Sequence, residues 1–72
     1  MHRFVICLDN NGYEASLEPR KLYEVLPDES ALKHGQLRVI DESGEDYLFP
    51  EALFLDAALA DDVAEKVADC SN

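Results

Sequence analysis

The chain has 72 residues, a length that allows one compact core and excludes a second domain on grounds of buried area. It carries 16 acidic and 6 basic side chains, for a formal charge of -10, which opposes binding to nucleic acids and to anionic lipid surfaces. Its apolar runs are too short for a membrane span or a secretory signal, so we expect no membrane association and a cytoplasmic location.

Two strands and an arm are expected in the first third of the chain. The apolar run rich in β-branched residues predicts a strand at Phe4–Leu8, and the Asn-Gly pair after it favours a tight turn. Residues Tyr13–Leu17 are polar and end at Glu18–Pro19, where proline disfavours a helix, so we expect an irregular arm or a short edge strand. The second strand is predicted at Lys21–Leu26.

The middle of the chain predicts three more strands. Glu29–His34 has the composition of one helical turn ended by glycine, and strands are predicted at Gln36–Ile40 and Asp46–Phe49, joined by turn-forming residues as a hairpin. Pro50–Leu53 predicts a 3₁₀ turn, and Phe54–Leu55 predicts a brief last strand. Five short strands in this length indicate a small barrel, because closure removes exposed sheet edges.

The tail changes to a helical pattern. Leu59, Val63 and Val67 recur every four residues, which predicts an amphipathic helix at about Ala57–Asp69. The expected organisation is a single domain, with a β-barrel at residues 1–55 and an amphipathic helix and tail at residues 56–72. Because such a helix is marginal alone, its apolar stripe must either cover the barrel or contact another chain, and we expect the two with equal weight.

Three segments carry a resemblance to a known group of proteins. They are residues 21–28 (KLYEVLPD), 34–35 (HG) and 38–50 (RVIDESGEDYLFP). With the order of the predicted elements, they make residues 4–55 similar to a group of small bacterial proteins of uncharacterised function with an SH3-like barrel. The resemblance implies a mainly β fold, a small five-stranded SH3-like barrel, to which the sequence adds a C-terminal α-helix. It implies no activity and no site residues.

An SH3-like barrel supports several functions, so the fold leaves the function open. The chain has no tryptophan, which argues against the type that binds proline-rich peptides in an aromatic groove. The main hairpin carries Asp41, Glu42, Glu45 and Asp46, which argues against the basic loops of RNA-binding barrels. We therefore expect a protein partner or self-association.

The same acidic hairpin suggests an alternative, a small regulatory domain that binds a ligand or a Ca²⁺-type metal ion through its turns. The spacing of the four carboxylates matches no calcium loop, so we predict no metal ligands, no cofactor and a solvated turn. Enzymatic chemistry is also not expected. Cys7 lies within an apolar strand, where burial raises a thiol pKa and makes the group inert, so we predict no catalytic residue.

The expected function is a non-enzymatic protein-interaction module with two candidate surfaces. The first is an aromatic patch of Tyr47, Phe49 and Pro50, which forms if the interior takes Leu48 instead of the aromatic side chains. Of the two aromatic residues, Phe49 is favoured for the core and Tyr47 is left open. The second is the helix stripe, whose residues are Leu59, Val63 and Val67.

Overall fold

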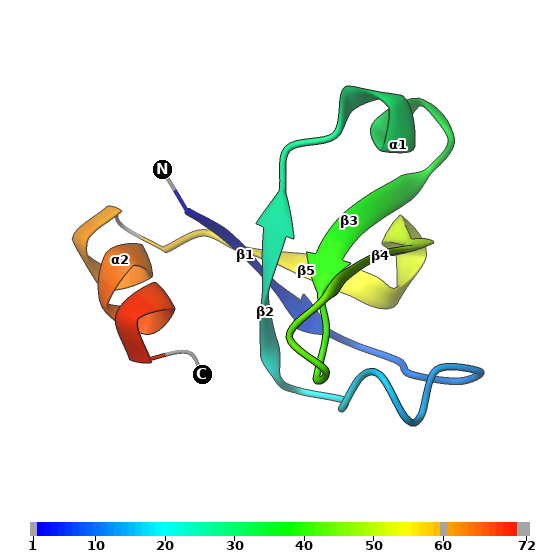
Figure 1. The fold of residues 1–72 in the computed structure, drawn as a ribbon, viewed down its shortest axis with the longest axis horizontal. Coiled ribbons are helices and arrows are strands. Elements are labelled where there is room, and N and C mark those ends of the chain that lie inside the picture. Colours follow the sequence, from blue (N-terminus) through cyan, green and yellow to red (C-terminus); the bar gives the residue numbers. More distant parts are fainter. Residues whose placement is uncertain (1, 60, 71–72) are drawn as a thin grey trace.

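The computed structural model describes residues 2–59 and 61–70 and contains five strands, two α-helices and one 3₁₀ turn (Figure 1). In chain order they are β1 (Arg3–Cys7), β2 (Leu22–Leu26), α1 (Glu29–Lys33), β3 (Gln36–Ile40), β4 (Asp46–Pro50), η1 (Glu51–Leu53), β5 (Phe54–Ala57) and α2 (Asp61–Cys70). The mainly β class with a C-terminal helix is confirmed.

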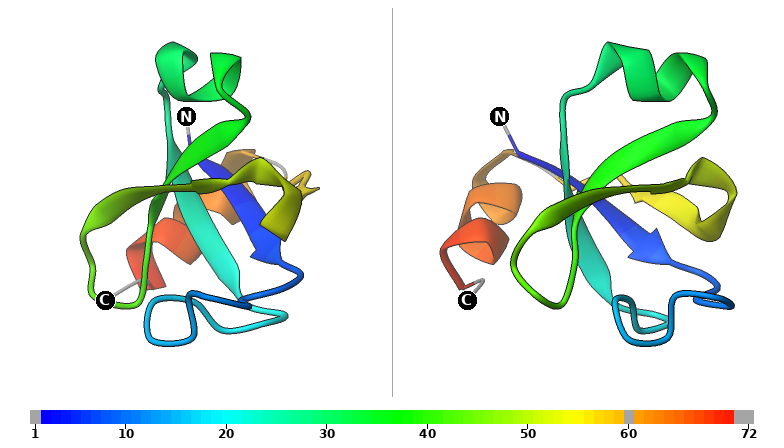
Figure 2. Two further views of the ribbon diagram at one scale, coloured as in Figure 1. Left: turned by 90° about the vertical axis from the view of Figure 1, so that its right-hand side faces the viewer. Right: turned by 45° about the vertical axis from the view of Figure 1, so that its right-hand side comes forward.

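The strands form one antiparallel sheet in the order β4-β3-β2-β1-β5, and the sheet is strongly curved (Figure 2). Within the described residues no ladder of hydrogen bonds joins β4 to β5, so the sheet is open and the predicted barrel closure is not confirmed. Two single backbone bonds continue existing ladders, the first that of β1 with β5 and the second that of β3 with β4. Leu8 N–H donates to Leu53 C=O at 2.7 Å, and Glu51 N–H donates to Gly35 C=O at 2.9 Å.

Element positions agree with the prediction best where the pattern is local. The bounds of β3 are those predicted, and η1 lies within the predicted Pro50–Leu53 turn but begins one residue later, because Pro50 ends β4. The last strand continues to Ala57, two residues beyond the predicted barrel range, because Ala57 pairs with Phe4 of β1. The helix therefore begins at Asp61, and its predicted start at Ala57 is wrong. Position 60 of the predicted helix and positions 71 and 72 of the predicted tail lie outside the described residues.

One hydrophobic core fills the inner face of the curved sheet. Every strand contributes side chains to it, among them Val5, Val39 and Phe49, which retain 0–2% of their exposure. The ring of Phe49 packs edge-on against Phe54 and against Tyr13, with centroids 6.2 and 5.2 Å apart. Such edge-to-face pairs are favoured by the aromatic quadrupole.

The arm between β1 and β2 is irregular, which is one of the two predicted alternatives, and it covers one end of this core. Leu17 projects from the arm into the core and is fully buried, so the arm is part of the packed structure. Arg20, at the end of the arm, has φ of 68°, a left-handed conformation that disfavours a side chain. Its N–H donates to Cys7 C=O at 2.7 Å, which fixes the chain as it enters β2.

The short helix α1 is held at its start by Asp28. This carboxylate accepts a hydrogen bond from Ala31 N–H at 3.0 Å and another from Arg38 Nε at 2.8 Å. Both bonds favour the charged form, so they lower the Asp28 pKa. Arg38 also donates to Asp46 at 3.0 Å, so one guanidinium joins α1, β3 and β4.

Candidate functional site

The outer face of the sheet, opposite the core, is also apolar across its three neighbouring strands β2, β1 and β5. In β1, Phe4 and Ile6 point to this face because they alternate with the core residues Val5 and Cys7. Ile6 stands directly opposite Leu22 of β2 on one side and Leu55 of β5 on the other. A sheet with two apolar faces needs a second covering layer.

Helix α2 provides part of that layer, on the side of β1 and β2 away from the core (Figure 1). Phe4 is absent from the inner core, yet it retains only 3% exposure, and Ala64 of α2 retains 1%. The helix thus lies against its own sheet. The cover is incomplete, since Leu22 is 36% exposed, Val63 is 43% exposed and Leu55 is 56% exposed.

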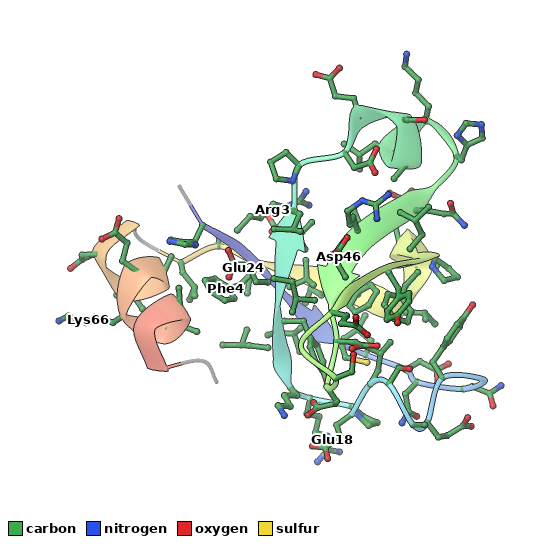
Figure 3. All side chains as sticks on the ribbon, in the orientation of Figure 1. Arg3, Phe4, Glu18, Glu24, Asp46 and Lys66 are labelled. Atoms are coloured by element: carbon green, nitrogen blue, oxygen red, sulfur yellow. The ribbon has the colours of Figure 1, made fainter. Side chains whose placement is uncertain are left out.

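Between α2 and the sheet lies an open groove of about 620 Å³, which we call the helix–sheet groove. Its lining combines apolar and charged side chains. The apolar and glycine positions are Phe4, Leu22, Ile40, Gly44, Val63 and Val67, and the polar ones are Lys21, Tyr23, Glu24, Asp41, Glu42 and Lys66. Figure 3 places Phe4 and Glu24 between the sheet and α2, with Lys66 at the outer edge of the molecule.

One wall of the groove is held by a network around Glu42. Its carboxylate lies 2.6 Å from Lys21 Nζ and accepts a hydrogen bond from the Tyr23 hydroxyl. The same hydroxyl accepts a bond from Glu18 N–H at 2.7 Å, and Glu42 N–H donates to Ser16 C=O at 3.0 Å. The β3–β4 hairpin is thereby fastened to β2 and to the arm.

The titration of this network follows from its contacts. Hydrogen bonds from Lys21 and then from Tyr23 stabilise the ionised carboxylate and lower the Glu42 pKa, while the same ion pair raises the Lys21 pKa. Burial, and then the bond to Glu42, raises the pKa of the Tyr23 hydroxyl above its ordinary value. At neutral pH the wall therefore consists of a charged pair and a neutral tyrosine.

The electrostatic setting of the groove is acidic. Among the described residues, three basic side chains pair with carboxylates of the same chain, namely Arg3 with Asp56, Lys21 with Glu42, and Arg38 with Asp28 and Asp46. Glu24 lies 2.7 Å from His2 Nδ1. Internal pairing thus leaves the large excess of carboxylates facing solvent.

The predicted aromatic patch does not form. Phe49 is 2% exposed and belongs to the core, while Leu48 is 40% exposed, which is the opposite of the arrangement the patch requires. Tyr47 is 50% exposed, and its hydroxyl donates to Glu45 at 3.1 Å. Pro50 is half-buried at the end of β4. Phe49 is thus unavailable to a partner, because β4 places it against Leu37 across the inner face.

The predicted helix stripe is divided. Val63 and Val67 lie one turn apart on α2 and both line the helix–sheet groove. Leu59 precedes the helix, is half-buried, and donates its N–H to Ala57 C=O at 2.8 Å. The structure therefore brings two of the three stripe residues together and corrects the assignment of Leu59 to the helix.

The acidic hairpin directs its carboxylates to different partners. Asp41 is buried and accepts bonds from the N–H and hydroxyl of Ser43, which shapes the turn. Glu42 and Asp46 bind Lys21 and Arg38, and Glu45 accepts from Tyr47. In the part of the chain that the structure describes, no group of three or more His, Cys, Asp or Glu side chains is placed to hold a metal ion. These carboxylates are used within the fold.

Cys7 is fully buried in β1, as predicted, and burial raises the pKa of its thiol.

A second hollow, of about 360 Å³, lies beside α1 and is lined by Leu32, Pro27, Arg3 and Arg38 among others. Carboxylates of the chain already hold both of its arginines. Neither helix in the described residues is long and apolar enough to cross a membrane.

Sequence reasoning missed the sheet half of the groove, formed by Phe4, Leu22 and Ile40. One signal was present. The first strand is a continuous apolar run without alternation, which is typical of a strand covered on both faces. That pattern predicts a layer outside β1, and α2 is the element left to provide it.

Comparison of the chain with family models, with curated proteins and with solved structures finds no match. A function has to be inferred from the groove itself.

Proposed function

We propose that the chain is a non-enzymatic interaction module that binds a segment of another protein in the helix–sheet groove. The observation that carries this proposal is the incomplete cover of the outer face. Leu22 and Val63 remain 36% and 43% exposed on opposite walls, above Phe4, which is buried. An apolar side chain inserted between them removes further apolar surface from water, at about 25 cal/mol per Å².

The groove has the form expected of a peptide site. It lies between a sheet and a helix, its lining combines apolar and charged side chains, and one wall is held by the Glu42 network. A site on rigid elements loses little conformational freedom when a partner binds. We propose no catalytic activity, because the thiol of Cys7 is buried and the carboxylates of the hairpin are engaged within the fold.

We also infer that the curved sheet is that of an SH3-like barrel, in keeping with the resemblance of residues 4–55 to small bacterial proteins. The strand order, with β1 between β2 and β5, supports this inference. The long arm after β1 and the 3₁₀ turn that leads into β5 support it as well. The proposed site would then lie outside the barrel, on the face that carries α2, and we expect the module to act in the cytoplasm.

The experiment that tests the function is site-specific photo-cross-linking in cells that naturally produce the chain. A photoreactive amino acid is placed at position 63 in the groove, and at position 8 as a control, since Leu8 is 55% exposed and is not part of the groove lining. We expect one protein to be captured from position 63 and not from position 8. The captured protein is then purified and its binding to the wild-type chain is measured.

The binding of that protein should fall about tenfold for Val63→Glu, because a carboxylate replaces an apolar contact, and should be unchanged for Leu8→Glu, which adds the same charge elsewhere. Equal capture from both positions, or equal binding by both variants, would contradict the proposed site. Capture of a second copy of the chain would contradict a distinct protein partner.

A further inference from the structure

We infer that the segment bound in the groove is cationic, with apolar side chains set between lysines or arginines, and that it is not a second copy of this chain. This inference rests on the function proposed above. It specifies the chemistry of the partner from the two kinds of surface that the groove offers.

Because the groove exposes apolar surface, we expect the bound segment to insert at least one apolar side chain. Leu22 on β2 and Val63 on α2 face the groove from opposite walls, and Phe4 lies buried between their elements. Val67 extends the helix wall by one turn. A leucine-sized side chain placed here contacts apolar groups on both walls, whereas a polar one would lose its water without gaining a partner.

The charge of the groove and of the chain determines which charge the bound segment should carry beside its apolar side chains. Three carboxylates line the groove, Glu24, Asp41 and Glu42, against two ammonium groups. One ammonium, Lys21, is held 2.6 Å from Glu42, and the other, Lys66, extends to the outer edge of the molecule (Figure 3). Glu42 is engaged by Lys21, and Asp41 is buried and engaged by Ser43, so the sign of the partner follows mainly from the formal charge of -10 on the whole chain, which attracts a basic segment and repels an acidic one.

Net charge argues against self-association through the same face. Each copy carries a formal charge of -10, so a dimer joins two strongly repelling molecules at their apolar grooves. The groove lining of each copy also carries three carboxylates against two ammonium groups, so two facing grooves gain no opposite charge from each other. A cationic segment meets neither obstacle, since its association is accelerated by the same field.

The test uses three short synthetic peptides with an identical backbone pattern. The first has two leucines separated by lysines and glycines, the second replaces each lysine by glutamate, and the third replaces each leucine by serine. Amide chemical shifts of the ¹⁵N-labelled full chain are followed during each titration. We expect the first peptide to shift residues of the groove, such as Leu22, Ile40 and Val63, and to leave the Leu8 region unchanged.

The two altered peptides separate charge from apolar contact. We expect the serine peptide to bind about tenfold more weakly or worse, and the glutamate peptide to give no shifts. If the serine peptide binds as tightly as the leucine peptide, or if shifts spread over the whole acidic surface, attraction is due to net charge alone and the inference is wrong. Since these measurements use the wild-type chain, they do not depend on the folding of a variant.

Two further measurements complete the test. The Val63→Glu variant should no longer bind the leucine–lysine peptide, whereas Leu8→Glu should bind it as the wild type does, although both variants gain the same negative charge. Light scattering across protein concentrations at low and moderate salt should give a monomer. A dimer whose formation changes the amide chemical shifts of the groove residues would show that a second copy occupies the groove, and it would overturn the inference.

Failure of this inference can be told apart from failure of the proposed function. If photo-cross-linking at position 63 identifies a protein whose binding Val63→Glu weakens, but the leucine–lysine peptide does not bind, the site stands and its cationic preference is wrong. If cross-linking at position 63 captures nothing specific, the function itself fails.

Discussion

The hydroxyl of Tyr23 offers a sharp test of the network that fastens the hairpin to the arm. It donates to the Glu42 carboxylate and accepts from Glu18 N–H, and the side chain is only 5% exposed. Tyr23→Phe removes both bonds without changing the ring. A hydrogen bond to a charged group is worth roughly 1.5–3 kcal/mol, so we expect a loss of about 2 kcal/mol in the free energy of unfolding.

That loss is large for a chain of this size, whose total stability is roughly 4–11 kcal/mol at about 0.05–0.15 kcal/mol per residue. It corresponds to a fall in Tm of roughly 8–16 °C. The assay is urea denaturation followed by circular dichroism, with Tyr47→Phe as a matched control. Tyr47 also donates its hydroxyl to a glutamate, but it is half exposed, so its variant should be close to wild type.

The pH dependence gives an independent check of the same group. Because the folded state raises the Tyr23 pKa, the stabilisation is complete below the ordinary tyrosine pKa of about 10 and is lost as the pH rises above it. The stability difference between wild type and Tyr23→Phe should therefore shrink in alkali. If Tyr23→Phe is as stable as Tyr47→Phe at neutral pH, the network does not fasten the hairpin.

Three more outcomes are expected from denaturation measurements. The lysine and tyrosine donors lower the Glu42 pKa, so the ionised carboxylate stabilises the fold above about pH 4.3, and this stabilisation is lost as the pH falls below that value. The difference in stability between wild type and Glu42→Gln should therefore vanish in acid. A difference that stays constant with pH would refute the pairing. Leu17→Ala should cost about 2–5 kcal/mol and Leu8→Ala less than about 0.5 kcal/mol, and equal effects would mean that the arm is not part of the core. Arg20→Gly should raise stability by about 0.5–1 kcal/mol because it relieves the positive φ, and a loss would show that this conformation is not strained.

Local patterns in the sequence predicted most of the elements, because strand and turn preferences act over a few residues. The strand at Gln36–Ile40 and the 3₁₀ turn after Pro50 are examples. The start of the helix was missed because pairing with β1 extends β5 to Ala57, and this long-range contact overrides the helical tendency of the alanines.

Only the helix side of the candidate site was predictable from the sequence, because the sheet side depends on contacts between distant residues. Val63 and Val67 follow from helical periodicity, but which sheet face they meet depends on tertiary packing. The burial of Phe49 was favoured in advance, whereas Tyr47 on the same strand face lies beyond the edge of the core, a difference that alternation alone does not encode. The left-handed Arg20 and the buried Leu17 belong to the arm, where no periodic pattern operates.

The position of β1 in the sheet has a consequence for the order of events in folding. Its neighbours are β2, which is the next strand in the chain, and β5, whose Ala57 pairs with Phe4 from 53 positions away in the sequence. Such distant pairing slows folding toward the millisecond-to-second range. During synthesis, β1 emerges early and keeps one edge and the apolar Ile6 exposed until β5 has left the ribosome. Of the five described strands, β1 is thus synthesised before the others and fully paired last. A chain halted before residue 54 would carry that open edge into contact with chaperones or with other nascent chains.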